Sequence, residues 1–363
     1  MMKKKWIAIP VVAIWVALTA MAWFGPDKAT SISERRPLAQ MPKVQMQSIL
    51  SGKFMTEFGK YTLDQFPLRD GFRRVKAQFH QNVLAQKDNN GIYLSQGYAA
   101  KQEYPLNKPS VSHALERFSQ IYERYLQDSR VVMAVVPDKG YYLAQDSGHL
   151  ALDYGAMFDM VRQGMPWAEH VDLTQSLSIQ DYYRTDTHWR QEKLLPVAQK
   201  LCQALDAELP QQEDYTQTGL DRPFYGVYYG QAALPMEPET MYLLESPVLN
   251  SCTVKDFETG KTSTVYNWDK LDSPDLYDVY LSGARALLTI ENPEAKTDRE
   301  LIIFRDSFGS SLAPLLVQGY AKVTLVDIRY LRADMLDQVM DFHGQDVLFL
   351  YSTLVLNNSS GIK

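Results

Sequence analysis

Three side chains from two distant parts of the sequence have the types needed for acyl transfer. Asp186 precedes His188 by two positions, and in an extended backbone such positions project to the same side. A hydrogen bond between the carboxylate and one ring nitrogen would fix the tautomer and leave the other nitrogen free to take a proton. Ser307 supplies a hydroxyl, which is a poor nucleophile until a base is held against it. The residue types therefore predict a Ser-His-Asp triad.

Each of these residues also has an ordinary structural role open to it. Ser307 follows the apolar run 301–304, and a serine after a strand often serves only as the N-cap of the next helix. His80 and His113 lie in helical patterns and have no acidic residue two positions earlier. His170 has acidic neighbours, which leaves a metal-binding interpretation open. We expect neither a metal nor a cofactor, because no His/Cys cluster has the spacing of zinc ligands.

Composition and motifs restrict the function further. The chain has 363 residues with 45% hydrophobic content, enough for one large domain or two smaller ones. The formal net charge is −6, which gives no basic face for nucleic acid. No phosphate-binding glycine loop and no GxSxG elbow is present. Cys202 and Cys252 are too few for a disulfide scaffold, and both a disulfide and two buried thiols stay open.

The N-terminus predicts work outside the cytoplasm. Lys3, Lys4 and Lys5 precede an uncharged run from Trp6 to Phe24, long enough to cross a bilayer as a helix. Positive residues stay on the cytoplasmic side, so the rest of the chain should lie outside. We favour a retained single-pass anchor in the cell membrane. A cleaved signal peptide, and hence a secreted protein, is the alternative, because residues 20–22 match the small-x-small cleavage pattern.

Apolar patterns along the remaining chain predict an α/β fold with a parallel sheet, because buried strands alternate with helices. The expected strands are 91–94, 131–136, 301–304, 322–326 and 347–351. Two helices are expected within 45–84, with a break at Phe66-Pro67. Further helices are expected at 111–127, 308–318 and 333–342. Residues 215–271 should form a β-rich insertion with a hairpin turn at 258–261. We expect a basic tip and anchor (1–24), a linker (25–43) and one domain (44–363).

Several separate blocks of the sequence resemble the DHHW protein family. This family occurs mainly in Gram-positive bacteria and is related to the SGNH-like acetyltransferases of alginate O-acetylation. The matching blocks, in chain order, are 34–39, 51–54, 64–70, 90–94, 184–189, 305–308, 326–330 and 346–351. One departure is Thr187 at the second position of the D-H-H-W block. The related acetyltransferases use D-x-H, so Asp186 and His188 keep their places.

The resemblance implies a permuted SGNH-hydrolase-like α/β/α sandwich, preceded by the transmembrane helix. It also implies that His188 deprotonates Ser307, which takes an acetyl group and passes it to a sugar hydroxyl. The Gly-Gly-Asn-like block of the family is present only as 282–284, and Gly283 is its candidate for binding the oxyanion. Arg329 could hold an anionic saccharide or make an ordinary salt bridge. Trp189 could stack on a sugar or pack beneath His188.

Three functions remain open from the sequence. The first is an O-acetyltransferase of an extracellular or cell-wall polysaccharide, which would work with a membrane-bound O-acyltransferase as its partner. The second is a carbohydrate acetylesterase with the same triad, in which water replaces the sugar. The third is a non-catalytic glycan-binding or assembly protein that keeps the fold. The triad alone does not separate the first two, because they differ in water exclusion and acceptor affinity.

Overall fold

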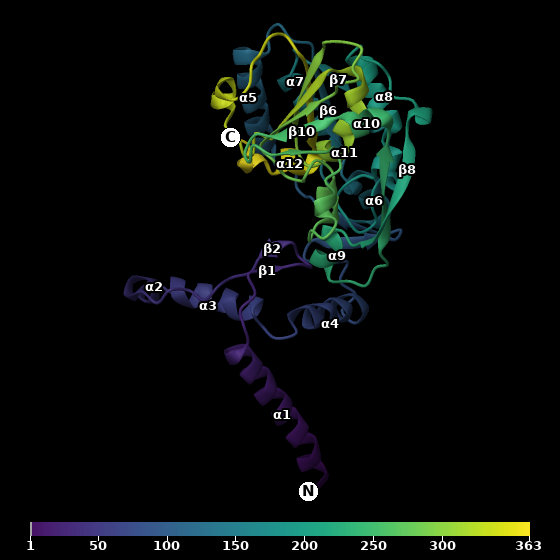
Figure 1. Ribbon diagram of the computed structural model, residues 1–363. Helices are drawn as coiled ribbons and strands as arrows, with labels where there is room; N and C mark the ends of the chain where they lie inside the picture. The colour runs from purple at the N-terminus through teal and green to yellow at the C-terminus, as the bar shows by residue number, and fades with distance from the viewer. Residues whose placement is uncertain (1) are drawn as a thin grey trace. The chain divides into compact units, whose positions relative to one another are not determined.

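The computed structural model describes residues 2–363, with side chains from Ile9 onward. The chain divides into two compact units (Figure 1). The smaller unit comprises Met1–Asn90 with Tyr229–Met236, and the larger comprises Gly91–Tyr228 with Glu237–Lys363. The sequence predicts one domain from residue 44 onward, whereas the larger unit begins at Gly91.

The larger unit is built on an eight-stranded sheet. The strand order is β11-β10-β12-β14-β13-β15-β6-β7. Their bounds are β6 (Val131–Val136), β7 (Glu169–Val171), β10 (Thr253–Asp256), β11 (Thr262–Ser263), β12 (Leu287–Glu291), β13 (Glu300–Arg305), β14 (Lys322–Val326) and β15 (Asp346–Ser352). The five strands from β14 to β7 run parallel, and β12, β10 and β11 extend the sheet in antiparallel pairs. The protein is therefore a mixed α/β fold with a large, mostly parallel sheet.

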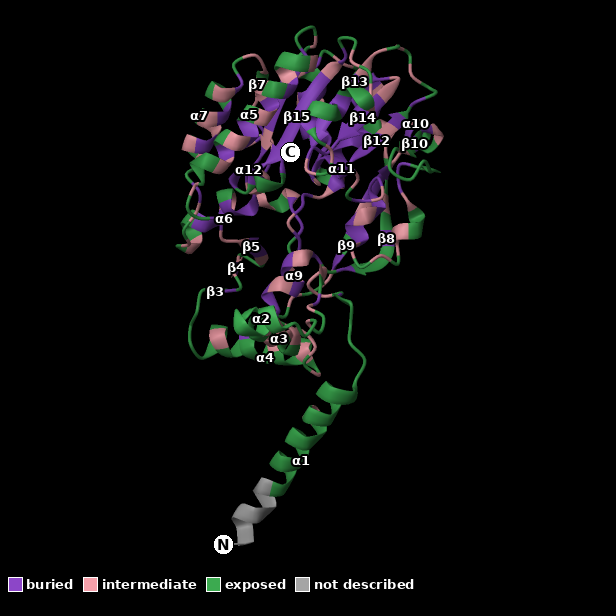
Figure 2. Ribbon diagram, turned by 90° about the vertical axis from the view of Figure 1, so that its left-hand side faces the viewer, coloured by how far each residue is buried: buried purple, intermediate pink, exposed green. Residues whose placement is uncertain are grey.

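Strand β13 lies between two hydrophobic cores. Leu301 and Ile303 belong to one buried cluster, and Ile302 and Phe304 belong to the other. Helices α5 (Lys108–Tyr125) and α7 (Tyr154–Gly164) contribute to the second cluster, and α8 (Leu195–Ala204) contributes to the first. Figure 2 shows the sheet as the most buried part of this unit. Burial on both faces explains why β13 reads as a continuous apolar run rather than an alternating one.

Most predicted elements of the α/β pattern are confirmed, and two helices differ in kind. The predicted helix 308–318 consists of a short α11 (Gly309–Leu312) and the 3-10 helix η6 (Ala313–Gly319). Pro314 has no N–H to donate to the carbonyl of Ser310, so an α-helix cannot continue there with its full hydrogen bonding. The predicted helix 333–342 is the 3-10 helix η7 (Ala333–Gln338). Strand β12 is an element that the sequence analysis missed.

The predicted β-rich insertion is divided between two sheets. Strands β8 (Thr216–Phe224) and β9 (Glu239–Glu245) form a separate antiparallel pair. Strands β10 and β11 instead extend the edge of the main sheet, and the predicted hairpin turn at 258–261 joins them. The other elements of these regions are β4 (Ile92–Ser95), β5 (Tyr98–Lys101), α6 (Lys139–Ser147), α9 (Val227–Ala232), α10 (Pro247–Ser251) and α12 (Thr353–Asn357).

The smaller unit is mainly helical. Its elements are α1 (Met2–Phe24), β1 (Thr30–Ser31), β2 (Arg36–Pro37), α2 (Met46–Leu50), α3 (Lys53–Asp64), α4 (Arg69–Asn82) and β3 (Asp88–Asn89). The predicted break at Phe66-Pro67 is confirmed, because α3 ends before it and α4 begins after it.

The predicted transmembrane helix is not found. Residues Trp6–Phe24 are helical within α1, but the described part of the chain contains no helix with both the length and the apolar character needed to cross a bilayer. The described side chains of α1 begin only at Ile9, and a spanning helix needs about 20 apolar residues. The side chains of Lys3, Lys4 and Lys5 lie outside the described ones.

The two cysteines are buried free thiols. Cys202 and Cys252 both lie in the first hydrophobic cluster without forming a disulfide. Burial raises the pKa of the Cys202 thiol to about 12 and that of Cys252 to about 11. Both thiols are therefore protonated at neutral pH and packed as small apolar side chains.

Candidate active site

The sheet places Ser307 where parallel α/β folds commonly hold their sites. Strand β13 ends at Arg305, and Ser307 lies in the turn that leads into α11. β13 pairs in parallel with β14 on one side and with β15 on the other, so this turn emerges at the carboxyl ends of central strands. Asp306 fixes the turn, since its carboxylate accepts hydrogen bonds from the backbone N–H groups of Phe308 (3.0 Å) and Ser352 (2.8 Å).

Asp186, His188 and Ser307 form one chain of hydrogen bonds. The distance from Asp186 Oδ1 to His188 Nδ1 is 2.6 Å, and that from His188 Nε2 to Ser307 Oγ is 2.8 Å. Asp186 is fully buried and His188 is 7% exposed. An ionised carboxylate can only accept, so Nδ1 carries the ring proton and the Nε2 lone pair faces the hydroxyl. In this state the imidazole can remove the serine proton.

The backbone of this segment is bent, not extended as the sequence analysis assumed. A single antiparallel bridge between Tyr182 and Trp189 closes a loop over 183–188. Within the loop, the backbone N–H of His188 donates to Asp186 Oδ1 at 3.0 Å. Aspartate side chains commonly accept from the N–H two residues on and so stabilise turns. The spacing of two therefore brings carboxylate and imidazole together through a turn.

A glycine allows a second chain segment to approach the carboxylate closely. The N–H of Val227 donates to Asp186 Oδ2 at 2.8 Å, and the N–H of Gly226 donates to Thr185 Oγ1 at 3.0 Å. A Cβ on Gly226 would lie 2.3 Å from the Cα of Asp186. The close approach of the two segments therefore requires glycine at position 226. With this approach, both carboxylate oxygens of Asp186 accept hydrogen bonds.

Substitution of Gly226 by alanine should therefore misplace Asp186. We expect Gly226→Ala to lower kcat for an acetyl ester by about 100-fold or more, since a shift of about 1 Å at a catalytic group costs this much. Steady-state kinetics and thermal unfolding would measure the effect. Gly155→Ala is the matched control, because a Cβ there would meet nothing closer than 3.7 Å. Equal kinetics in both variants would show that the contact does not position the carboxylate.

Two buried charged side chains, Glu239 and Lys139, bind the backbone of the loop 183–188. Glu239 accepts from the backbone N–H groups of Arg184 and Thr185, each at 2.9 Å, and from Thr185 Oγ1 at 2.9 Å. Lys139 Nζ donates to the carbonyl oxygens of Tyr183 (2.9 Å) and Arg184 (3.3 Å). These bonds satisfy backbone groups that are taken out of water and fix the path of the chain into Asp186.

The charge state of Lys139 should make stability depend on pH. Burial lowers the pKa of Lys139 to about 7, although the carboxylates of Asp186, Glu239 and Asp138 act to raise it. Between this value and the ordinary lysine value of about 10.4, the unfolded chain binds a proton that the folded chain does not. The contribution of Lys139 to the free energy of unfolding therefore rises with pH in this window, by at most about 1.4 kcal/mol per pH unit.

Urea unfolding at pH 7 and pH 9 would test this dependence. We expect the difference in the free energy of unfolding between the protein and its Lys139→Met variant to grow with pH. A difference that stays constant would mean that the pKa of Lys139 is not lowered by burial. Lys101→Met is a control at a half-exposed lysine.

Aromatic side chains fix the plane of the imidazole. The Tyr277 ring stacks on His188 with centroids 3.9 Å apart and an interplanar angle of 8°. The Tyr277 hydroxyl lies 2.7 Å from Ser311 Oγ, which also accepts from the indole N–H of Trp189 at 3.0 Å. Trp189 is fully buried and additionally donates to the carbonyl of Phe308. Full burial excludes the suggested stacking of Trp189 on a sugar. The indole packs edge-on against Phe308, whose ring lies 5.0 Å from that of His188.

Two further predicted site residues are held in other interactions. Gly283 lies in a turn with φ of +80°, and its N–H donates to the carbonyl of Tyr280 at 3.1 Å. This N–H is therefore already used and does not offer a free donor for an oxyanion. Arg329 makes a two-pronged ion pair with the buried carboxylate of Asp327, at 2.9 and 2.6 Å. The structure thus supports the salt-bridge interpretation of Arg329.

The other histidines stay outside this arrangement. His170 lies in β7, with Nε2 at 2.9 Å from the carbonyl of Met165. Within residues 2–363, no group of three or more His, Cys, Asp and Glu side chains could hold a metal.

The fold of this chain is similar to that of several solved structures. No family model and no curated protein matches the sequence. Among solved structures, a DHHW family protein from Eubacterium siraeum superposes with a TM-score of 0.59 at 21% identity, over 76% of this chain and 95% of that one. The chain has the fold of a DHHW family protein. This agrees with the blocks of sequence that resemble the family.

Two further solved structures also match, at lower identity. PatB1 from Bacillus cereus, solved with a sulfonyl adduct, has a TM-score of 0.54 and 17% identity, over 73% of this chain and 95% of that one. The O-acetyltransferase domain of Pseudomonas putida AlgJ has a TM-score of 0.44 and 14% identity, over 74% of this chain and 92% of that one.

Proposed function

We propose that the protein is an O-acetyltransferase of an extracellular or cell-wall polysaccharide, working through an acetyl-serine intermediate on Ser307. The observation that carries this proposal is the hydrogen-bonded chain from Asp186 through His188 to Ser307, at the end of the central strand β13. The resemblance of the sequence blocks to the DHHW family supports the substrate class, and the fold shared with a DHHW family protein agrees with that resemblance. The permuted SGNH arrangement implied by that resemblance belongs to the same proposal.

The first half-reaction transfers the acetyl group to the protein. Ser307 Oγ attacks the carbonyl carbon of an acetyl ester or thioester while its proton moves to His188 Nε2. The resulting oxyanion needs hydrogen-bond donors. The backbone N–H of Ser307 has no acceptor within the described chain and would supply one such donor. The carbon–leaving-group bond then breaks, and His188 gives its proton to the leaving group.

The second half-reaction transfers the acetyl group to the acceptor. A sugar hydroxyl loses its proton to His188 Nε2 and attacks the acetyl-serine carbonyl. The bond to Ser307 Oγ breaks, and the proton returns to this oxygen. Throughout, Asp186 stays ionised and stabilises the imidazolium, since three N–H groups donate to its carboxylate. Water in place of the sugar would give hydrolysis by the same steps.

The decisive experiment is to incubate the purified protein with a chromogenic acetyl ester, with and without oligosaccharide acceptors. We expect release of the chromophore, an acetyl group on Ser307 by mass spectrometry, and acetylated oligosaccharide as product. Release of free acetate alone, unchanged by acceptors, would identify an esterase. Absence of any acetyl-serine, together with unchanged glycan acetylation in cells carrying Ser307→Ala, would favour a non-catalytic glycan-binding protein.

A sulfonyl fluoride offers a second probe of the nucleophile. PatB1 has been solved with a sulfonyl adduct, and sulfonyl fluorides react with activated serine hydroxyls. We expect one sulfonyl group on Ser307 and loss of turnover in parallel. Labelling of the Ser307→Ala variant at an equal rate would place the reactive group elsewhere.

We propose that the protein acts on the outer face of the cell membrane, retained by its N-terminal segment. The support is the sequence of three lysines followed by the apolar run to Phe24. In this position it would receive acetyl groups from a membrane-bound O-acyltransferase that carries them across the bilayer. Protease added to intact spheroplasts should digest the protein, and recovery in the soluble fraction would indicate a cleaved signal peptide instead.

A further inference from the structure

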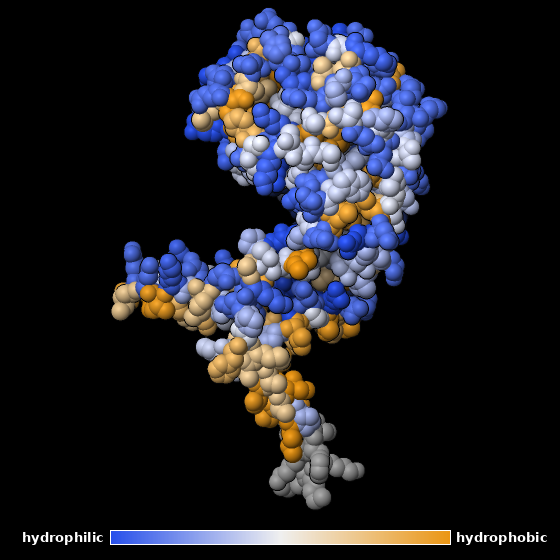
Figure 3. Space-filling model, in the orientation of Figure 1, coloured by the Kyte–Doolittle hydropathy of each residue, from blue (hydrophilic) through white to orange (hydrophobic). Residues whose placement is uncertain are grey.

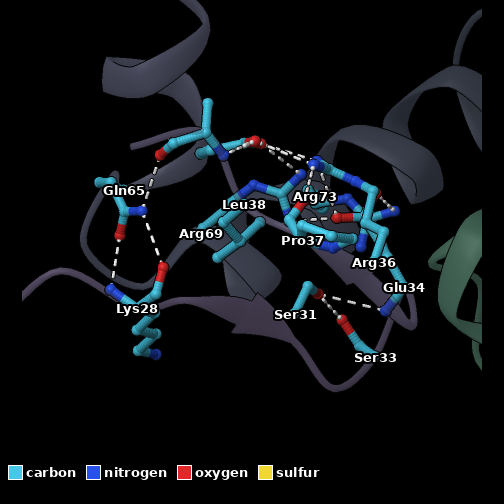
Figure 4. A network of polar contacts seen from close by, with 12 residues as sticks. Lys28, Ser31, Ser33, Glu34, Arg36, Pro37, Leu38, Gln65, Arg69 and Arg73 are labelled. Atoms are coloured by element: carbon cyan, nitrogen blue, oxygen red, sulfur yellow. Dashed lines mark hydrogen bonds and ion pairs between the residues drawn. The ribbon is translucent and has the colours of Figure 1, made fainter. Parts of the chain in front are cut away.

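Helix α4 turns its charged side inward. Arg69 and Arg73 form ion pairs with Glu34, with nitrogen–oxygen distances of 2.5 and 3.2 Å, and Arg69 also lies 3.3 Å from Asp64 (Figure 4). Arg36 joins the same cluster through a two-pronged contact with Asp64. The arginines on this side of α4 are thus used to hold the helix against the rest of the smaller unit.

The side of α4 next to these arginines is apolar and faces outward. Phe72, Val75, Phe79 and Val83 recur at intervals of three and four residues and therefore share one side of the helix. They are 49%, 65%, 50% and 65% exposed. We call these four residues the α4 apolar face. A helix of a water-soluble domain normally buries such a side, so α4 has the reverse arrangement.

The neighbouring helices extend this apolar surface. On α3, Phe54 and Phe58 stack with centroids 5.9 Å apart, and Phe58 contacts Tyr61. On α2, Met46 and Leu50 are 72% and 81% exposed. Figure 3 shows hydrophobic side chains along α1 and along one edge of the segment from α2 to α4. The exposed apolar side chains are thus gathered on several helices of one unit.

The charge of this unit is opposite to that of the rest of the chain. The smaller unit has 14 Lys and Arg against 6 Asp and Glu, whereas the larger unit has 23 against 37. On α4, Arg74 and Lys76 are exposed, and among the described residues no ion pair involves Lys76. An excess of positive charge beside exposed apolar side chains is typical of segments that bind anionic lipid surfaces.

A cavity lies at the border of the α4 apolar face. It has a volume of about 590 Å³ and lies between the charged and apolar sides of α4, with Arg69, Phe72, Arg73 and Lys76 among its lining residues. Leu63 and Phe66 supply further apolar walls. A lysine amine at the edge of an apolar cavity could contact a lipid phosphate while its methylene groups stay among acyl chains.

We propose that the α4 apolar face, together with α3, lies on the surface of an anionic phospholipid bilayer. Phe72, Val75 and Phe79 would enter the boundary between headgroups and acyl chains, and Lys76 would contact a phosphate. Charge favours a lipid surface over a protein groove, because the unit's surplus of basic residues complements anionic headgroups. This contact is independent of α1 and of the proposed chemistry, and it would hold the smaller unit flat on the membrane.

Cysteine accessibility in the full-length protein tests the proposal. Cys202 and Cys252 are buried free thiols, so a water-soluble maleimide should report on added cysteines. Val75→Cys and Phe79→Cys probe the apolar face. Gln81→Cys is the matched control, because a residue two positions beyond Phe79 lies about 200° around the helix. The protein is reconstituted in phosphatidylcholine vesicles with and without phosphatidylglycerol.

We expect labelling at positions 75 and 79 to slow by roughly tenfold when phosphatidylglycerol is present, and labelling at position 81 to stay unchanged. High salt and Lys76→Gln should weaken this protection. Equal labelling rates at all three positions would overturn the proposal. So would protection that is equal without phosphatidylglycerol, or protection in detergent that grows with protein concentration, which would indicate a second copy of the chain.

Discussion

Replacing His188 with alanine should lower the turnover of a chromogenic acetyl ester by about four to six orders of magnitude. The imidazole is the only group that lies within hydrogen-bond distance of the Ser307 hydroxyl among the described contacts, at 2.8 Å. Without it, the hydroxyl keeps its proton and attacks slowly. The fold should persist. Far-ultraviolet circular dichroism, which reports the sheet and not this side chain, would check this. Stopped assays over long incubation times would measure the residual rate.

His170→Ala is the control for this variant. His170 belongs to the same unit and is half-buried, but it lies in β7 and contacts a backbone carbonyl, not Ser307. We expect its loss to change turnover less than tenfold. Should His188→Ala retain near-normal turnover while acetyl-Ser307 still forms, another group must be the base.

The second large effect is expected for Asp186→Asn, with turnover reduced about 10⁴-fold at neutral pH. The carboxylate accepts from the ring and backbone N–H groups of His188 and from the N–H of Val227. An amide keeps the shape but presents an NH₂ group to one of these donors. The ring then takes the other tautomer or turns away, and Nε2 no longer faces Ser307 as an acceptor.

The double variant distinguishes this mechanism from a general loss of structure. Asp186→Asn combined with His188→Ala should be about as slow as His188→Ala alone, because the aspartate acts through the imidazole. Asp181→Asn is the matched control, since Asp181 only caps a 3-10 turn in the same segment. Multiplicative losses in the double variant would indicate that Asp186 has an independent role.

The His188→Ala and Asp186→Asn variants together test how far the imidazole is already held in position before a substrate binds. A carboxylate holds one edge of the imidazole, the Tyr277 ring stacks on its face, and the Phe308 ring lies 5.0 Å away at a tilt of 57°. Such support limits the reorganisation that the reaction would require. The buried charges of Lys139 and Glu239 contribute to the same support. Burying them would be unfavourable without the hydrogen bonds that they make to the loop carrying Asp186.

Several features were predictable because their signals are local. The strands β6, β13, β14 and β15 are short apolar runs bounded by turn residues, and each was predicted to within a residue or two. A buried parallel strand can be recognised from its own residues, without knowing which strand it pairs with, because burial on both faces makes every position apolar. The pair Asp186 and His188 was likewise detected from its spacing, although through the wrong backbone conformation.

Other features depend on residues that are distant in sequence. Gly226 and Glu239 support the Asp186 loop, yet nothing near them in the sequence indicates that they will meet it. Lys139 follows a strand and a proline, where a polar residue is ordinary. The clearest available signal was a charged residue at the carboxyl end of a predicted central strand, the edge at which sites of parallel sheets form.

By itself, the sequence determined the α/β pattern, the residue types of a serine-based acyl-transfer site and the separation of the helices in 45–84. Only the tertiary structure decided which polar groups are free to act. Trp189, Gly283 and Arg329 were all candidates for substrate contact, but the indole, the amide and the guanidinium are each engaged elsewhere in the fold. Residue type fixes what a side chain can do, whereas its packed neighbours, brought from distant parts of the chain, decide which of its groups remain available.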